Sequence, residues 1–338
     1  MNIQRLIVGA MRLLPPALIR RMAGDPWVID GFTLDPHIHV VANMAARQAT
    51  DAPSLETRRA EARAAFEMLN APRRAGVHVI DTDVPGPAGR MPIRQYQPQG
   101  KRDAEPAILF FHQGGLVILD LDTCDPFCTI LADECQARVI SLDYRLCPEH
   151  AFPAAIDDAM ALWDYVQENA ETLGIDPTRV ALAGDSAGGL IAADLCHLLK
   201  ARGGTQPAAQ LLIYPWVTSD LNETGSLVSC AEAFPLNQEV MHYFRSQVFP
   251  DDKGNDDPLA NPLEQDLTGL PPAVVATAGF DPIRDQGNAY AEKLAEAGNQ
   301  VTHHCFGSLS HSFVGMGNVS RAATAASVQI ARDLAAYL

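Results

Sequence analysis

From about residue 107 to the end of the sequence, continuous apolar runs alternate with longer amphipathic segments. Strands that are apolar on both faces must be covered on both sides, and the segments between them are long enough to be crossover helices. This alternation predicts an α/β fold with a mainly parallel central sheet flanked by helices. The expected strands are 107–112, 138–146, 179–186, 209–215, 273–280 and 301–307, and the expected helices are 123–135, 154–173, 187–202, about 287–297 and about 320–337.

Two regions lie outside this alternation. Residues 1–75 are helical in character, and Ser54 is a candidate N-cap for the segment SLETRRAEARAAFEML. Residues 216–255 bring turns and a further helix, and an insertion of this length between two strands usually carries function. Between the first region and the sheet, two segments alternate as the strands of a meander do, at 77–86 and 91–98.

The composition argues against several classes of protein. A formal net charge of −16 disfavours nucleic acid and anionic membrane surfaces as partners. Seven cysteines without C-x-x-C spacing argue against a disulfide framework and a zinc site, and favour reduced thiols in a cytoplasmic protein. No stretch is long and apolar enough to span a bilayer. The N-terminal segment is broken by Arg12, Pro15 and Pro16, so we favour an amphipathic helix over a signal peptide, with membrane-surface contact as a minor alternative.

The sharpest motif is G-x-S-x-G at residues 184–188. It follows an expected strand and opens an expected helix, which is the context of a nucleophile elbow. Glycines beside the serine let the chain turn sharply where a side chain would clash. We therefore predict that Ser186 is a nucleophile, held in a strained turn at the carboxyl edge of the sheet.

A serine hydroxyl is a weak nucleophile at neutral pH, so it needs a base, and the base needs an orienting acid. In a sheet of this kind the acid follows a late strand and the base follows the last one. Asp281 ends the run AVVATAGF and is preferred over Asp285, which lies one turn into the next helix. His311 lies in the loop after the last strand, whereas His303 and His304 lie within that strand, one expected to be packed and one solvated.

These motifs resemble those of the hormone-sensitive-lipase-like carboxylesterases of the α/β-hydrolase superfamily, over nearly the whole chain. Within the stretches that match, two positions depart from the family pattern: Cys147, where alanine is usual, and Ser312, where glycine is usual. The resemblance implies a hydrolase fold with a helical cap made from residues 1–75 and the insertion 216–255, and a catalytic domain made from 76–215 and 256–338. The matching stretches are GDSAGG (184–189), DYRLCPEHAFPAA (143–155), DPIRDQG (281–287) and HSF (311–313).

Acyl transfer also needs backbone N–H groups that already point at the developing oxyanion. Ala187, directly after the nucleophile, is expected to supply one of them. The family's loop after the early strand reads His-Gly-Gly-Gly, and here it reads His-Gln-Gly-Gly at 112–115. The resemblance therefore implies that Gly114 and Gly115 supply the other donors.

The remaining residues of these loops are expected to support them or to line the substrate pocket. His112 resembles the histidine that holds the loop in this family, and Asp185 precedes the nucleophile. For Gln113 the alternatives stay open: its side chain lines the pocket, hydrogen-bonds the loop in place, or is a harmless surface variation.

Together these features predict a serine carboxylesterase that acts on neutral, short- to medium-chain esters through an acyl-enzyme, with no cofactor and no metal. Amide hydrolysis on the same triad stays an alternative, because the chemistry is shared. A non-catalytic small-molecule-binding protein is the rival from another class, and it is disfavoured because all three triad positions are filled. The expected partner is a small-molecule ester, without nucleic acid or stable membrane insertion, in the cytoplasm; a homodimer is left open.

Overall fold

The computed structural model describes residues 3–47, 54–100, 104–252 and 254–338. The centre of the described chain is an eight-stranded sheet in the order β10-β9-β8-β7-β5-β6-β4-β3. The pairs β3–β4 and β4–β6 are antiparallel and all other neighbouring pairs are parallel, so the predicted, mainly parallel sheet is confirmed. The strands are β3 (His78–Gly86), β4 (Gly89–Gln97), β5 (Glu105–Phe111), β6 (Arg138–Leu142), β7 (Ile175–Asp185), β8 (Gln210–Ile213), β9 (Ala273–Phe280) and β10 (Val301–Ser310).

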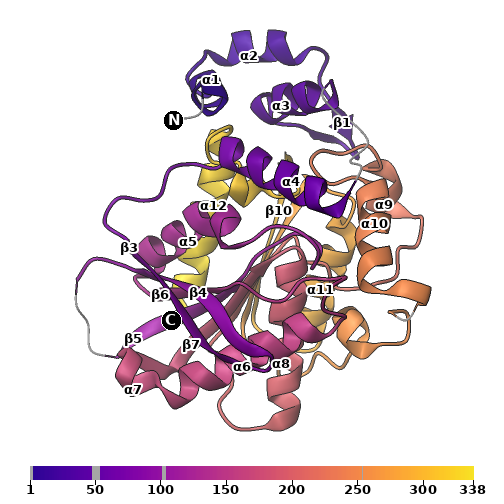
Figure 1. The fold of residues 1–338 in the computed structure, drawn as a ribbon. Helices are drawn as coiled ribbons and strands as arrows, with labels where there is room; N and C mark the ends of the chain where they lie inside the picture. Colours follow the sequence, from indigo (N-terminus) through magenta and orange to yellow (C-terminus); the bar gives the residue numbers. More distant parts are fainter. Residues whose placement is uncertain (1–2, 48–53, 101–103, 253) are drawn as a thin grey trace.

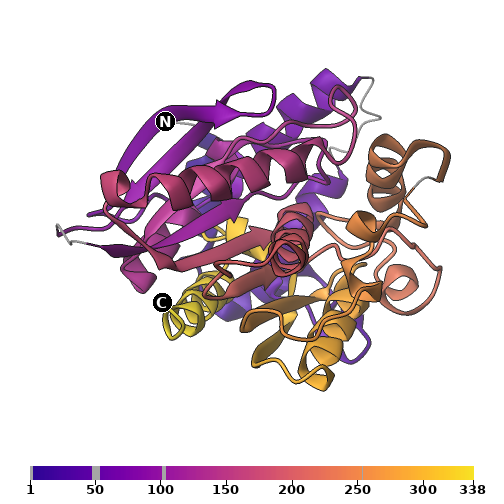
Figure 2. The same ribbon diagram turned by 90° about the horizontal axis from the view of Figure 1, so that it is seen from below.

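Helices cover both faces of this sheet (Figures 1 and 2). One face carries α5 (Leu121–Cys135) and α12 (Arg321–Ala335), and the other carries α6 (Ala154–Glu168), α8 (Ala187–Arg202) and α11 (Arg284–Glu296), with the short α7 (Ala170–Leu173) before β7. Successive strand residues point to opposite faces. Ile108 and Phe110 therefore join the core under α5 and α12, whereas Leu109 and Phe111 join the core under α6 and α8.

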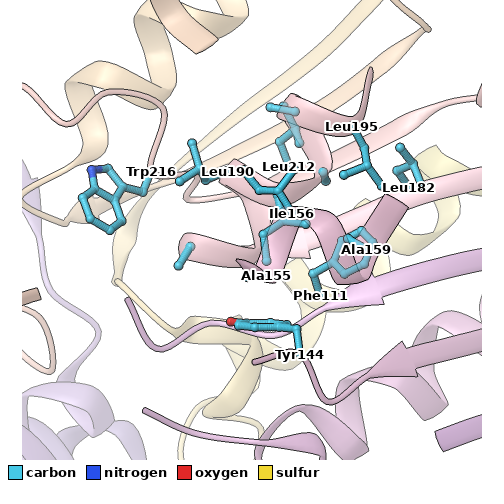
Figure 3. Packing of buried hydrophobic residues seen from close by; sticks show 14 of the residues in the cluster. Phe111, Tyr144, Ala155, Ile156, Ala159, Leu182, Leu190, Leu195, Leu212 and Trp216 are labelled. Carbon is cyan, nitrogen blue, oxygen red and sulfur yellow. The ribbon is translucent and has the colours of Figure 1, made fainter. Parts of the chain in front are cut away.

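Figure 3 shows the second of these cores at close range. Phe111 of β5, Leu182 of β7 and Leu212 of β8 face Ile156 of α6 and Leu190 of α8, and each of these side chains is at most 1% exposed. Burial of such side chains contributes about 1.5–3 kcal/mol each. The packing fixes the ends of β5 and β7, which hold the candidate site.

Two groups of elements lie outside the sheet and its helices (Figure 1). The N-terminal group comprises α1 (Ile3–Met11), α2 (Pro16–Ala23), β1 (Val28–Ile29), β2 (Phe32–Thr33), α3 (Pro36–Ala46) and α4 (Leu55–Leu69). The group after β8 comprises α9 (Gly225–Ser229), α10 (Gln238–Val248) and the 3-10 turns η1 (Pro250–Asp252), η2 (Pro258–Ala260) and η3 (Pro262–Glu264). The two groups meet where the guanidinium of Arg58 in α4 lies over the Tyr243 ring of α10, 4.4 Å from its centroid.

The observed elements agree with the expected ones to within a few residues. Ser54 caps α4 by accepting the N–H of Thr57, as expected. β6 ends at Leu142 rather than at 146, because its partner β5 also ends there, with Phe111 opposite Leu142. β10 runs on to Ser310 through a register shift, and the 3-10 turn η4 (Phe313–Gly315) follows it. None of the helices in the described ranges combines the length and apolarity that crossing a bilayer requires.

Candidate active site

The turn between β7 and α8 carries Ser186, which has φ 56° and ψ −116°. A positive φ is uncommon for a residue other than glycine. The end of β8 braces the turn: the Ser186 N–H donates to the Ile213 carbonyl at 2.8 Å, and the Trp216 N–H donates to the Ser186 carbonyl at 3.1 Å. A Cβ on Gly188 would run into the Phe111 carbonyl, so the helix can approach β5 this closely only with glycine there. This is the strained elbow that the sequence predicts.

His311 lies between Ser186 and Asp281. Its Nε2 is 3.0 Å from the Ser186 Oγ, and its Nδ1 is 2.7 Å from the Asp281 Oδ2. The second carboxylate oxygen of Asp281 accepts the N–H of Ile283 at 2.9 Å, which fixes the carboxylate plane. The Tyr214 ring packs against the imidazole, with centroids 4.5 Å apart. Loops that follow β7, β9 and β10 thus bring the three expected residues into one buried, hydrogen-bonded series.

The rival residues lie elsewhere. Asp285 sits in α11, where its carboxylate accepts the N–H of Ser226 at 2.8 Å and holds the segment after β8. His303 is exposed on β10. His304 is half-buried, and its Nε2 is 2.7 Å from a carboxylate oxygen of Asp333 in α12. None of these three side chains hydrogen-bonds to Ser186 or to the catalytic candidates in the described chain.

The loop after β5 lies beside the elbow. β5 and β7 are parallel neighbours in which Phe111 pairs with Gly184, so the loops that follow them start at the same edge of the sheet. Gly114 and Gly115 adopt φ values of 123° and 62°, which favour glycine. Within the described residues, the backbone N–H groups of Gly114, Gly115 and Ala187 donate no hydrogen bond. They are therefore available to a ligand oxygen.

Gln113 is only 5% exposed, so the interpretation of this departure as a surface variation is wrong. Its Oε1 accepts a hydrogen bond from the Oγ of Ser312, the residue directly after His311. Its carbonyl oxygen lies 2.7 Å from the His112 Nδ1. Of the alternatives left open by the sequence, the one in which the glutamine hydrogen-bonds the loop in place agrees with this geometry.

Two aromatic–polar pairs lie beneath the loops. The His112 ring stacks on Tyr144 with centroids 4.3 Å apart, and the Tyr144 hydroxyl donates to the His112 carbonyl at 2.7 Å. Burial lowers the pKa of His112 to about 4, so its imidazole is neutral and its Nδ1 donates to the Gln113 carbonyl. Burial raises the pKa of Asp185 to about 7, although a hydrogen bond of 3.0 Å from the Tyr214 hydroxyl acts in the opposite direction.

Side chains from outside the sheet cover the loop after β5. A Cβ on Gly115 would meet the Phe244 ring of α10, so this ring lies directly against the glycine. Arg59 of α4 donates from its Nε to the Val117 carbonyl at 2.9 Å. These contacts are not predictable from the sequence, because nothing local marks which loop a distant helix will touch. Tyr214 is a further residue outside the predicted set, although a polar aromatic at the end of an expected strand, on the edge that carries Ser186, is a sequence signal for it.

The side chains at the site are a hydroxyl, an imidazole and a carboxylate, a set that suits proton transfer to and from a serine oxygen. In the part of the chain that the structure describes, no three histidine, cysteine, aspartate or glutamate side chains are grouped as ligands for a metal ion.

Comparison with known proteins places this geometry in a family. The alpha/beta hydrolase fold family matches residues 108–315, a span that contains all three members of the hydrogen-bonded series. The carboxylic ester hydrolase LipN of Mycobacterium tuberculosis is 38% identical over 353 aligned residues, which cover 100% of this chain and 93% of LipN.

Two solved structures agree with this assignment. The esterase of Pyrobaculum calidifontis superposes with a TM-score of 0.85 at 34% identity and covers 90% of this chain and 98% of its own. An ester-hydrolase from the Lake Arreo metagenome, solved with a bipyridine phosphonate derivative, has a TM-score of 0.84 at 37% identity with the same coverage of 90% and 98%. This chain therefore belongs to the α/β-hydrolase superfamily, among its hormone-sensitive-lipase-like carboxylesterases.

Proposed function

We propose that this protein hydrolyses carboxylic esters, with Ser186 as nucleophile, His311 as general base and acid, and Asp281 as the orienting carboxylate. The observation that carries the proposal is the hydrogen-bonded series from the Asp281 Oδ2 through both ring nitrogens of His311 to the Ser186 Oγ, at 2.7 and 3.0 Å. These distances are within the hydrogen-bond reach that a nucleophile and its base require.

In the acylation step, the Ser186 Oγ attacks the ester carbonyl carbon while the His311 Nε2 takes the hydroxyl proton. The imidazolium that forms is stabilised by Asp281, which accepts the Nδ1–H and whose other oxygen is already held by a backbone N–H. The free N–H groups of Gly114, Gly115 and Ala187 are the donors proposed for the tetrahedral oxyanion. The proton on Nε2 then passes to the leaving alkoxide, and the alcohol departs.

In the deacylation step, water takes the place of the alcohol. The His311 Nε2 removes a proton from the water as it attacks the acyl carbonyl, and returns that proton to the Ser186 Oγ as the acid is released. The same donors serve both oxyanions, because attack occurs at the same carbonyl carbon in both steps. Atoms and protons balance without a cofactor.

We propose neutral esters of short to medium acyl length as substrates. A net charge of −16 disfavours anionic substrates, and the Phe244 ring that closes over the loop after β5, directly against Gly115, is apolar. We include in this proposal a cap formed by residues 1–75 and 216–255, and a cytoplasmic location, which the seven free cysteines support.

The test is a series of nitrophenyl esters of increasing acyl length, assayed with the wild type and Ser186→Ala. We expect the wild type to be active and the variant to lose about 10⁴- to 10⁶-fold in kcat while its circular dichroism is unchanged. A Ser186→Ala variant that keeps a tenth of the wild-type rate would exclude Ser186 as nucleophile. A matched aryl amide, assayed alongside, distinguishes ester from amide hydrolysis. Faster turnover of the amide than of the ester would show that the protein is an amidase.

A further inference from the structure

Two residues at which this chain departs from the pattern of similar hydrolases contact each other. Gln113 stands in the loop after β5 where glycine is expected, and Ser312 stands directly after His311 where glycine is usual. Although 199 positions separate them, the Ser312 hydroxyl donates to the Gln113 Oε1. One departure therefore supplies the donor and the other supplies the acceptor.

The two side chains are buried and conformationally restrained. Gln113 is 5% exposed and Ser312 is 3% exposed. Ser312 has φ 64° and ψ 20°, a left-handed conformation that costs a residue with a side chain roughly 1–2 kcal/mol and glycine almost nothing. A serine at such a position needs a compensating contact, and the buried hydrogen bond to Gln113 provides one.

The bond links two loops that are far apart in the sheet. The loop 112–118 follows β5 and the loop 311–315 follows β10, and β7, β8 and β9 lie between these strands. Among the described residues, no other hydrogen bond joins the two loops. Because the first loop carries the proposed oxyanion donors and the second carries His311, the bond ties the two halves of the reaction centre together.

We propose that Gln113 and Ser312 act as a pair of positioning residues that hold the oxyanion-donor loop in register with His311. The inference rests on the proposed function. The Gln113 carbonyl accepts a hydrogen bond from the neutral His112 ring, and the Gln113 side chain accepts one from Ser312. These two bonds together fix the peptide plane between Gln113 and Gly114. Loss of the bond lets Gly114 and His311 shift relative to each other. That shift weakens contacts made only in the transition state, so kcat should fall while KM changes little.

A double-mutant cycle tests the pair. Gln113→Met keeps length and apolar bulk but removes the acceptor, and Ser312→Gly removes the donor and suits the φ of 64°. We expect each single variant to lose about three- to tenfold in kcat, with KM within about twofold. The double variant should lose no more than the worse single one, because the second change removes a partner already left unpaired.

The same assays include controls that separate positioning from packing. Ser310→Ala removes a buried hydroxyl that donates to the His311 carbonyl at 3.4 Å but does not reach the oxyanion-donor loop, and it should change kcat less than about twofold. Ser312→Ala also removes the hydroxyl that donates to Gln113, so its kcat should fall, as in Ser312→Gly. Urea midpoints for every variant show whether the loss in kcat follows stability.

Any of three results would overturn the proposal that Gln113 and Ser312 act as a pair. The first is a loss in kcat for the double variant equal to the product of the two single losses, and the second is a loss below about twofold in each single variant. The third is a loss in kcat for Ser310→Ala as large as that for Ser312→Gly. Each leaves the esterase assignment intact, because the wild type and its Ser186→Ala comparison are measured in the same experiment. Activity in Ser186→Ala would overturn the proposed function instead.

Discussion

Gly115→Ala tests whether α10 is seated on the oxyanion-donor loop. The added methyl would lie within 2.7 Å of three ring carbons of Phe244, whereas non-bonded carbons settle at about 3.5–4.0 Å. The ring or the loop must therefore retreat by about 1 Å. Overpacking of this kind costs about 1–3 kcal/mol, and the φ of 62° costs an alanine roughly a further 1–2 kcal/mol.

The loop is the weaker of the two partners, because Phe244 is buried among the side chains that fix α10. We expect the strain to displace the Gly115 N–H and to lower kcat/KM by about 10²-fold, equivalent to about 2.7 kcal/mol. In a Phe244→Ala background the clash disappears and the backbone strain remains. There Gly115→Ala should cost only about tenfold.

Nitrophenyl ester kinetics for the four proteins of this cycle give the coupling directly. Gly174→Ala is the matched control: its φ is 69°, but nothing lies within 4 Å of the added Cβ. It should lose about 1 kcal/mol of stability through backbone strain alone and keep its kcat. Equal losses from Gly115→Ala in the wild-type and Phe244→Ala backgrounds would show that α10 does not press on this loop.

Three further predictions concern pH, the N-terminal helices and metal ions. Burial raises the pKa of Asp194 well above its usual value, Asp257 adds to the effect, and neither carboxylate oxygen has a hydrogen-bond partner among the described residues. Protonated Asp194 stabilises the folded state fully below about pH 4, and this stability is lost as pH rises towards the folded-state pKa. The amide in Asp194→Asn does not titrate, so the free energy of unfolding of this variant relative to the wild type should increase from about pH 4 to about pH 8 in urea titrations. The same relative free energy at the two pH values would contradict this. Deletion of residues 1–47 removes buried side chains such as Ile19 and Ile38, and should impair solubility and slow hydrolysis of the longer acyl chains; unchanged kinetics would mark the segment as dispensable. Prolonged chelation should leave the esterase rate unchanged, and loss that zinc restores would contradict the proposed mechanism.

Local patterns in the sequence are sufficient to predict the sheet and the grouping of Ser186, His311 and Asp281 at its carboxyl edge. The strands ending at Asp185 and Phe280 are rich in apolar residues, and the G-x-S-x-G motif fixes its own backbone geometry, so the elbow is recognisable within five residues. Parallel strands share a carboxyl edge, so the expected strands alone predict that Asp281 and His311 lie near Ser186.

The features that sequence reasoning missed depend on tertiary contacts. Nothing near Gln113 indicates that its partner is Ser312, because three strands separate their loops in the sheet. The contact of Phe244 with Gly115 depends on where α10 docks, which the helical pattern of that segment does not specify. Asp194 resembles a surface residue of an amphipathic helix, but α8 is enclosed by the sheet, by α6 and by the segment after β8, so the carboxyl group is fully buried.

The site of covalent modification by an organophosphate shows whether Ser186 is the nucleophile. Titration of the wild type with the reagent, followed by mass spectrometry of peptides, measures stoichiometry and position together. We expect one phosphoryl group per chain, on Ser186, with esterase activity lost in proportion to labelling and labelling strongly slowed in His311→Ala. Stoichiometric labelling at another residue, or ester hydrolysis that survives complete labelling of Ser186, would show that Ser186 is not the nucleophile.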